Sequence, residues 1–283
     1  MVLSSNMAIN VLKSTGETQP FDRDKVRRTI LRSGASEATA DKIADEVEKN
    51  VREGTRTKEI YDMVVRLLEQ EAPAASRRYD LRNAILRLGP AGFDFEKYIA
   101  ALLAAYGYKT ELPPILEGIC ITHEVDVLAT KDGRVAMIEA KLRQELGIFI
   151  TIKDTMSTWA RFLDLVDASK VGKTPHLDEC WIMTNSRFST QSIQYGHCKN
   201  MVMLSWDHPR ERPLPRWIDE IGLYPVTILK SVDATKLKAF SEANIMLLRD
   251  LVKMPPENLE KSLALPKETV AKLIEEAKMI LEK

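Results

Sequence analysis

The chain has 283 residues, of which 45% are hydrophobic, so it is long enough for two or three domains with buried cores. Its 41 Lys and Arg residues are balanced by 41 Asp and Glu residues, which gives a formal net charge of zero. Because nonspecific affinity for DNA grows with the number of basic contacts to phosphate, this balance excludes a generally basic protein that coats nucleic acid. Any DNA-binding surface is expected to be local.

The cysteines and the hydropathy of the sequence limit the class of protein further. Cys120, Cys180 and Cys198 are an odd number without C-x-x-C spacing, so neither a disulfide framework nor a zinc ribbon is predicted. No apolar run is long enough to cross a bilayer, and the first residues lack the pattern of a signal peptide. We therefore expect a soluble cytoplasmic protein with no membrane partner.

Residues 1–88 have the pattern of a short strand and turn followed by helices. Asp22 is the expected N-cap of the first helix. Apolar residues recur at helical spacing in the helices that follow, as at Ile43 and Val47. The predicted elements are a strand over 8–13, a turn over 14–17, and helices over about 23–33, 37–52, 57–69 and 75–88.

This order resembles the ATP-cone domain, the regulatory cap found on ribonucleotide reductases and on a related transcriptional repressor. The residues that match are Val11-Leu12-Lys13, Gly16, Phe21-Asp22, Lys25-Val26, Thr57-Lys58-Glu59-Ile60 and Tyr79. The resemblance implies that Val11 borders the adenine of a bound nucleotide, that Lys13 and Lys25 meet its phosphates, and that Thr57 contacts it. Lysines and a hydroxyl near helix ends suit a triphosphate. ATP or dATP is the implied allosteric effector.

The alternative for this segment is a helical dimerisation or DNA-binding domain. The basic residues of the first helix would then form a solvated face, as charge runs usually do. These residues are Arg23, Lys25, Arg27, Arg28 and Arg32. We rank nucleotide sensing first, because the order of strand, turn and capped helix matches over most of the segment.

A β-hairpin is predicted between Ile121 and Leu142, because two alternating apolar runs flank Asp132-Gly133, a strong signal for a type I′ turn. A two-residue turn sets the register and the faces of the strands. The resulting pairs are Lys131 with Arg134, Leu128 with Met137, Asp126 with Glu139, and Glu124 with Lys141. On the second strand, Ala136, Ile138, Ala140 and Leu142 form one face, while Val135, Met137, Glu139 and Lys141 form the other. The acidic pair and the lysine therefore share a surface.

Carboxylates that face each other across a ladder repel, and a divalent cation would offset that repulsion. Mg²⁺, or Mn²⁺ in its place, prefers carboxylate oxygens and keeps waters for a substrate phosphate. Lys141 would then position the attacking water or stabilise charge on the phosphate. The alternative is a solvated hairpin face in which Glu124 and Lys141 form a cross-strand ion pair of little energetic value.

Asp126 followed by Glu139-Ala140-Lys141 resembles the D…E-x-K core of the PD-(D/E)-x-K nuclease superfamily, with Val125 where that family usually has proline. Three further segments, spread over roughly 89–206, resemble its Mrr-like restriction endonuclease branch. They are Gly92-Phe93-Asp94-Phe95-Glu96, Tyr106-Gly107-Tyr108 and Thr184-Asn185-Ser186-Arg187-Phe188-Ser189. In that branch the helix glutamate, matched by Glu96, lies beside the metal. The resemblance implies Asp126, Glu139 and Glu96 as metal ligands, and these three with Lys141 as the catalytic set.

The later elements complete a layered fold and add a helical tail. The pattern predicts helices over 155–166 and 190–197 and strands over 180–184 and 201–205. Together they indicate a mixed sheet with helices on both faces, an α/β/α arrangement. Pro209, Pro213 and Pro215 mark a stiff connection. The apolar residues in this connection indicate that it packs against another part of the protein. Helices over 235–241, 245–252, 256–263 and 267–282 resemble paired helix-hairpin-helix elements, although their hairpins lack glycine. A contact with DNA and a role in protein association both stay open for this tail.

The predicted fold class is an α/β multidomain protein. Its parts are a helical ATP-cone-like domain (1–88), an Mrr-like nuclease domain (89–208), a proline-rich connection (209–231) and a small all-α domain like helix-hairpin-helix proteins (232–283). We predict a nucleotide-regulated, Mg²⁺-dependent DNA endonuclease that forms a homodimer or higher homo-oligomer. The sequence has no P-loop, so ATP hydrolysis is not predicted.

Two alternative functions stay open. One is a non-cleaving, nucleotide-responsive DNA-binding regulator. The other is a structure-selective nuclease of DNA repair or Holliday-junction resolution. The sequence does not distinguish methylated, branched and unmodified DNA as the substrate, and it does not say whether nucleotide activates or inhibits.

Overall fold

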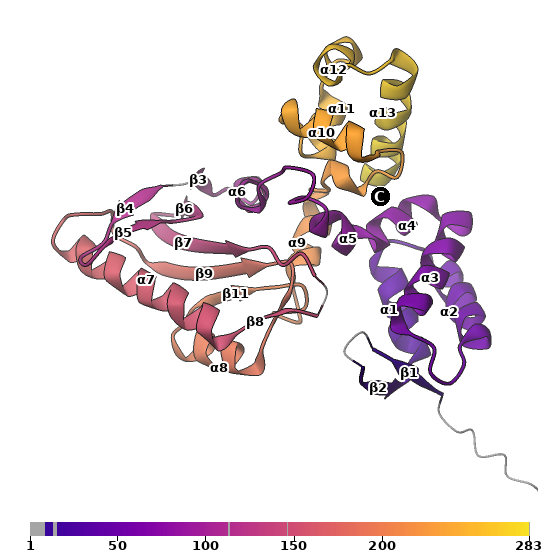
Figure 1. The fold of residues 1–283 in the computed structure, drawn as a ribbon, viewed down its shortest axis with the longest axis horizontal. Coiled ribbons are helices and arrows are strands. Elements are labelled where there is room, and N and C mark those ends of the chain that lie inside the picture. The colour runs from indigo at the N-terminus through magenta and orange to yellow at the C-terminus, as the bar shows by residue number, and fades with distance from the viewer. Residues whose placement is uncertain (1–8, 14–15, 113, 146, 283) are drawn as a thin grey trace, which may run out of the picture.

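The computed structural model describes residues 9–13, 16–112, 114–145 and 147–282. It contains an N-terminal helical lobe, a central unit built on a sheet, and a C-terminal helical unit that lies between them at one end of the sheet (Figure 1). The prediction of a mixed α/β protein with a mixed sheet is confirmed. Ala8 and the turn residues Ser14 and Thr15 lie outside the described residues.

The N-terminal lobe joins a small antiparallel ribbon to a helical bundle. Its ribbon pairs β1 (Asn10–Leu12) with β2 (Thr18–Pro20). Asp22 is the N-cap of the first helix as predicted, and its Oδ1 accepts a hydrogen bond of 2.8 Å from the Lys25 backbone N–H. The helices are α1 (Arg23–Arg32), α2 (Glu37–Asn50), α3 (Thr57–Glu71) and α4 (Pro73–Tyr79).

The single helix predicted over 75–88 is wrong, because the chain forms two short helices there. α4 ends at Tyr79 and α5 (Leu81–Leu86) follows, with Asp80 between them at φ −81° and ψ 4°. The Asp80 carboxylate accepts hydrogen bonds from Tyr61, Asn83 and Arg87. Aspartate favours helix ends because its short side chain competes for local hydrogen bonds.

A five-stranded mixed sheet forms the centre, in the order β11-β9-β7-β6-β3. Its middle strand, β7 (Arg134–Lys141), runs antiparallel to β6 (Val127–Lys131) and parallel to β9 (Glu179–Thr184). Strands β3 (Lys109–Glu111) and β11 (Val202–Leu204) form the edges. Helix α6 (Phe95–Ala105) covers one face, while α7 (Ile152–Lys170) and α8 (Thr190–Cys198) cover the other (Figure 1).

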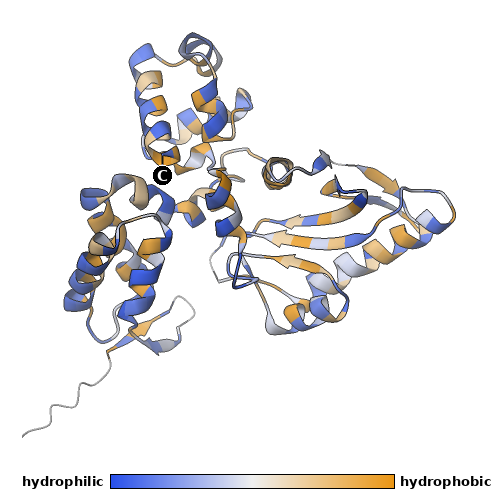
Figure 2. Cartoon of the chain, turned by 180° about the vertical axis from the view of Figure 1, so that it is seen from behind, coloured by the Kyte–Doolittle hydropathy of each residue, from blue (hydrophilic) through white to orange (hydrophobic). Residues whose placement is uncertain are grey.

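The β6–β7 hairpin has the predicted turn and register. Asp132 and Gly133 have φ values of 50° and 76°, and a type I′ turn requires positive φ at both positions. Lys131 pairs with Arg134 and Leu128 pairs with Met137. Hydrophobic residues run along the central strands (Figure 2), and their alternation sends Ile138 to the α6 side and Met137 to the α7 side. Glu139 is thereby directed toward the α7 side.

The predicted pairing of Glu124 with Lys141 is wrong. Glu124 pairs instead with Ile115, in a separate ribbon of β4 (Ile115–Glu117) and β5 (Thr122–Glu124). The residues before Val127 lie outside the main ladder because the β4–β5 ribbon is bound to α7. The buried His123 lies 2.7 Å from Asp164 of α7 through its Nε2. A further two-stranded ribbon, β8 (Phe149–Ile150) with β10 (Arg187–Phe188), lies near the end of β7.

The C-terminal unit shares a core with the sheet. The segment 209–231, expected as a connection, contains α9 (Leu214–Ile221) and the short 3₁₀ helix η1 (Val226–Ile228), and its apolar residues are buried as their pattern indicated. The remaining helices are α10 (Ala234–Glu242), α11 (Leu248–Lys253), α12 (Pro256–Leu263) and α13 (Lys267–Leu281). The buried Tyr98 of α6 donates a 2.7 Å hydrogen bond to the Leu223 carbonyl. Among the described residues, no helix has the length and apolar character needed to cross a bilayer.

Candidate functional site

The structure brings Asp126, Glu139 and Lys141 together at the end of the β6–β7 hairpin. Asp126 directly precedes Val127, which forms the last ladder pair with Ile138, and the register continued by one residue places Asp126 opposite Glu139. One Asp126 oxygen accepts a 2.7 Å hydrogen bond from the Ala140 backbone N–H, which holds the carboxylate against β7. The geometry predicted from the turn is thus present for this pair.

The Glu139 carboxylate is buried and bound by two cations. Glu139 is only 6% exposed. Oε1 lies 2.6 Å from Lys141 Nζ, and Oε2 lies 2.5 Å from Nη1 of Arg161. Arg161 comes from α7 and also donates to the Glu124 carbonyl oxygen. Two positive charges therefore neutralise a carboxylate that would otherwise be costly to bury.

Arg161 was not among the site residues predicted from the sequence. It lies one turn from Thr158 and one residue before Phe162, both of which are buried against the sheet. A basic residue beside the apolar stripe of a helix was the signal present in the sequence. Such residues are usually solvated, so the contact with Glu139 could be found only once α7 was placed on the sheet.

The end of β7 is fixed by its parallel neighbour. The Thr184 hydroxyl at the end of β9 donates a 2.7 Å hydrogen bond to the Lys141 carbonyl. The Asn185 side chain then exchanges two hydrogen bonds of 2.8 Å with the backbone of Arg143. Both Thr184 and Asn185 are buried, so they position the strand that carries the charged residues.

Asp126 has the most strongly perturbed ionisation of this cluster. Burial raises the pKa of Asp126 to about 6, and the charges of Glu139 and Glu96 act in the same direction. The Ala140 N–H and the Arg161 charge only partly oppose that rise in pKa. A carboxyl that titrates just below neutral pH beside a second carboxylate is a common property of functional sites.

Glu96 lies in the first turn of α6 and is half-buried. It acts on Asp126 through its charge, although α6 covers the sheet face opposite to α7. Glu96 and Glu139 are therefore both within electrostatic reach of Asp126. Within the described part of the chain, no three His, Cys, Asp or Glu side chains are arranged as a complete metal site.

The oxygen donors of Asp126 and Glu139 nevertheless fit one class of ion. Mg²⁺ is usually held by one or two carboxylates, and its other ligands are waters and substrate phosphates. The pair matches that limited donor set in chemistry, and a bound Mg²⁺ would take the place of Lys141 or Arg161 at one oxygen of Glu139. The third acidic residue, Glu96, could add a water-mediated contact.

A second candidate site lies where β1 meets α3 in the N-terminal lobe. Leu12 forms a parallel bridge with Arg56 and its N–H donates to the Thr55 carbonyl at 3.0 Å. Lys13, which follows β1, and Thr57, which begins α3, are consequently neighbours. Arg56 is the N-cap of α3 but makes no capping hydrogen bond with its side chain. A helix start without a side-chain cap is suited to an anion such as phosphate.

The other residues of the N-terminal set differ in their surroundings. Lys25 is exposed on α1, whereas Val11 is 2% exposed and packs into the core of the lobe. Lys13 is bound to Glu17 at 3.0 Å. Two of the five basic residues of α1, Arg23 and Arg27, are paired with Asp41 of α2, at 3.2 and 2.8 Å. This pairing argues against a DNA-binding surface on α1.

Comparison with known families identifies the two ends of the chain. Residues 9–84 match the family model described as "ATP cone domain". Residues 224–281 match the model described as "AF1548-like, C-terminal". The resemblance of the N-terminal lobe to ATP-cone domains is confirmed, and nucleotide binding is the property that this domain suggests. The C-terminal helices belong to the AF1548-like type.

A relative and a solved structure extend the likeness beyond these ends. A protein of Archaeoglobus fulgidus named "Uncharacterized protein" is 32% identical over 183 residues, which are 65% of this chain and 99% of the relative. The crystal structure titled "Protein of Unknown Function AF1548" is 31% identical, with a TM-score of 0.55. It covers 66% of this chain, and the match includes 97% of the solved chain. The chain belongs to the AF1548-like family.

Proposed function

We propose that this protein is a nucleotide-regulated, Mg²⁺-dependent DNA endonuclease. The observation that carries the proposal is the pair formed by Asp126 and Glu139, half-buried and buried, with Lys141 bound to Glu139 at 2.6 Å. The resemblance to Mrr-like nucleases inferred from the sequence of residues 89–206 agrees with the same assignment.

Each residue has a distinct role in the proposed reaction. Asp126 and Glu139 would hold the cation, and Glu96 would support it through water. Bound Mg²⁺ polarises phosphoryl oxygen and lowers the pKa of a bound water. Lys141, which here shares Glu139 with Arg161, would orient the attacking water and stabilise the negative charge of the phosphate.

We further propose that ATP or dATP binds the N-terminal lobe as an effector. Phosphates would lie at the N-terminus of α3 between Lys13 and Thr57, with Lys25 as an additional cation. The ATP-cone match over residues 9–84 supports this assignment. Association into dimers would supply two sites for the two strands of a duplex.

The direct test is cleavage of DNA by the purified full-length chain with Mg²⁺. Asp126→Ala and Lys141→Ala should each lower the rate by about a hundredfold or more. Glu124→Gln is the matched control, because Glu124 is an exposed acidic residue near the site and should leave the rate unchanged. Undiminished cleavage by both site variants would overturn the mechanism. A preference for branched over linear DNA would assign the enzyme to repair or junction resolution.

The second candidate is a non-cleaving DNA-binding regulator that responds to nucleotide. The ion pairs from Lys141 and Arg161 to both oxygens of Glu139 favour it, since a neutralised carboxylate can be structural. Nucleotide-dependent DNA binding without cleavage would support this role. The assay should cover duplex, flap, junction and modified DNA with Mg²⁺ and with Mn²⁺.

A further inference from the structure

Helix α3 connects the candidate nucleotide site to the C-terminal unit. Thr57 begins the helix, and Tyr61, Val65 and Glu69 follow at intervals of one turn. The adjacent stripe of Ile60, Val64 and Leu68 packs in the core of the lobe. A packed helix of this kind moves as a rigid body, so a displacement at Thr57 reaches Glu69.

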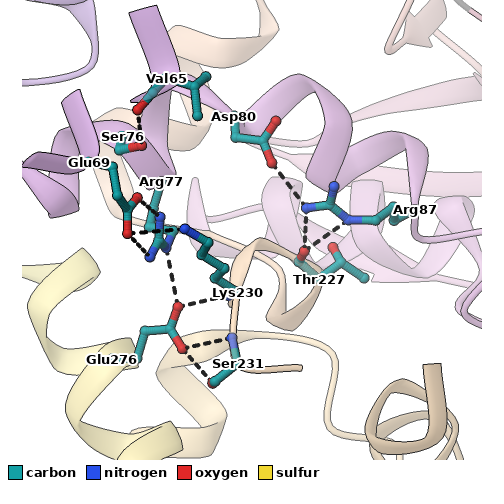
Figure 3. Close-up of polar contacts among 10 residues, drawn as sticks. All are labelled: Val65, Glu69, Ser76, Arg77, Asp80, Arg87, Thr227, Lys230, Ser231 and Glu276. Atoms are coloured by element: carbon teal, nitrogen blue, oxygen red, sulfur yellow. Dashed lines mark hydrogen bonds and ion pairs between the residues drawn. The ribbon is translucent and has the colours of Figure 1, made fainter. Parts of the chain in front are cut away.

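The first link from α3 passes through Arg77 of α4 (Figure 3). Arg77 Nη2 donates to Glu69 at 2.9 Å, and its Nε donates to Glu276 of α13 at 3.2 Å. Glu276 in turn accepts from the Lys230 backbone N–H at 2.7 Å and from the Ser231 hydroxyl at 2.5 Å. Arg77 therefore joins α3 to α13, and Glu276 joins α13 to the segment at residue 230, where Lys230 Nζ also lies 3.3 Å from Glu69.

The second link passes through Asp80, which lies between α4 and α5. Tyr61 of α3 donates to Asp80, and Arg87 lies 3.2 Å from the same carboxylate. Nη2 of Arg87 also donates to the Thr227 carbonyl at 2.8 Å (Figure 3). Both links end on the segment 227–231, and both start from the same face of α3.

A cavity of about 310 Å³ lies between the two links. Val65 of α3 lines one side, and Ile228, Leu229 and Val232 line the other. This pocket is open to solvent, so it leaves room for the segment to move relative to α3. The polar links hold the present spacing across it.

The charged side chains of the first link are largely buried. The Arg77 and Glu276 side chains are 12% and 13% exposed. Burial opposes ionisation of Glu276, but the Ser231 hydroxyl and the N–H groups of Lys230 and Ser231 outweigh it and lower its pKa. Loss of either partner would leave a poorly solvated charge, so the link is either made as a unit or broken as a unit.

We propose that the link Glu69–Arg77–Glu276 transmits nucleotide occupancy of the N-terminal lobe to α13 and the segment 227–231. This inference rests on the proposed nucleotide sensing. Val226, just before the segment, belongs to the same continuous core as Ile138 and Ala140 of β7. Packed residues therefore connect the segment to the strand that carries Glu139 and Lys141, so a shift of the segment can reach that strand.

The test is hydrogen exchange and ATP binding of the full chain in the wild type, Glu276→Gln and Glu275→Gln. In the wild type, ATP should change the exchange of the Lys230 and Ser231 amides, which donate to Glu276. Glu276→Gln should abolish that change and shift the ATP dissociation constant by about fivefold or more. Glu275→Gln is the matched control, because Glu275 is the exposed neighbour on the same helix, and it should behave as the wild type.

Ser231→Ala provides a milder variant that removes one hydrogen bond from Glu276 without altering a charge. It should reduce the ATP-induced exchange difference in the same residues. ATP binding with the same affinity and the same exchange difference in wild type and Glu276→Gln would overturn the inference alone. Absence of ATP binding by the wild type would overturn the proposed nucleotide sensing and this inference with it.

Discussion

Asp126 is the residue whose chemistry depends most on its neighbours. Its raised pKa, about 6, follows from burial first and from the charges of Glu139 and Glu96 second. The spacing of Asp126 and Glu139 could be predicted from the sequence, because a two-residue turn fixes which residues face each other. Arg161 could not, because its contact with Glu139 depends on the placement of α7.

The pKa of Asp126 predicts a pH-dependent stability. A carboxyl whose pKa is higher in the folded state than in the unfolded state stabilises the fold below its unfolded value, near 4. That contribution is lost as the pH rises through about 6. Asp126→Asn cannot ionise, so without added metal it should melt a few degrees above the wild type at pH 7.5, and the difference should vanish near pH 4. Calorimetry from pH 4 to 8 tests this, and parallel curves would contradict the assignment.

Among the elements, the ribbon of β4 and β5 is the one that differs most from the predicted hairpin. Its position depends on Asp164, which accepts from the Cys120 N–H at 2.9 Å and lies 2.7 Å from His123. Those contacts link residues more than forty positions apart, so local patterns did not reveal them. By contrast, the type I′ turn and the cap at Asp22 depend on neighbouring residues, and both could be predicted.

Gly118 is the residue on which this ribbon depends. A Cβ atom at this position would lie 2.0 Å from Oδ2 of Asp164 and 2.4 Å from the Ile121 carbonyl oxygen. Gly118→Ala should therefore displace the ribbon from α7 and destabilise the protein by about 1–3 kcal/mol. Urea denaturation measures that loss, and faster proteolysis between residues 112 and 124 would locate it. An unchanged midpoint would show that the ribbon is not held in this way.

At the scale of the whole molecule, the three parts are joined in two different ways. The C-terminal unit shares a continuous hydrophobic core with the sheet, whereas the N-terminal lobe has a core of its own. The lobe contacts α13 largely through charged groups, including the two hydrogen bonds from Arg78 to the Ile280 and Glu282 carbonyls. The proline-rich segment suggested a connection in the sequence, but the buried helix α9 makes it part of the core.

Separate cores predict separate unfolding. Scanning calorimetry of the full chain should resolve two transitions, one for the N-terminal lobe and one for the sheet with the C-terminal unit. ATP should raise the midpoint of the lobe transition by mass action, by an amount that grows with its concentration. A single transition that ATP does not move would contradict both the separation of the cores and nucleotide binding by the lobe.

We propose that a metal-dependent cleavage site on the sheet is controlled by nucleotide in the lobe. The most direct measurement is the rate of DNA cleavage by the full chain with Mg²⁺, with and without ATP or dATP, for the wild type and for Glu139→Gln. The wild type should cleave DNA at a rate that changes with nucleotide, and Glu139→Gln should not cleave in either condition. Cleavage by Glu139→Gln at the wild-type rate, or wild-type cleavage that nucleotide does not alter, would contradict it.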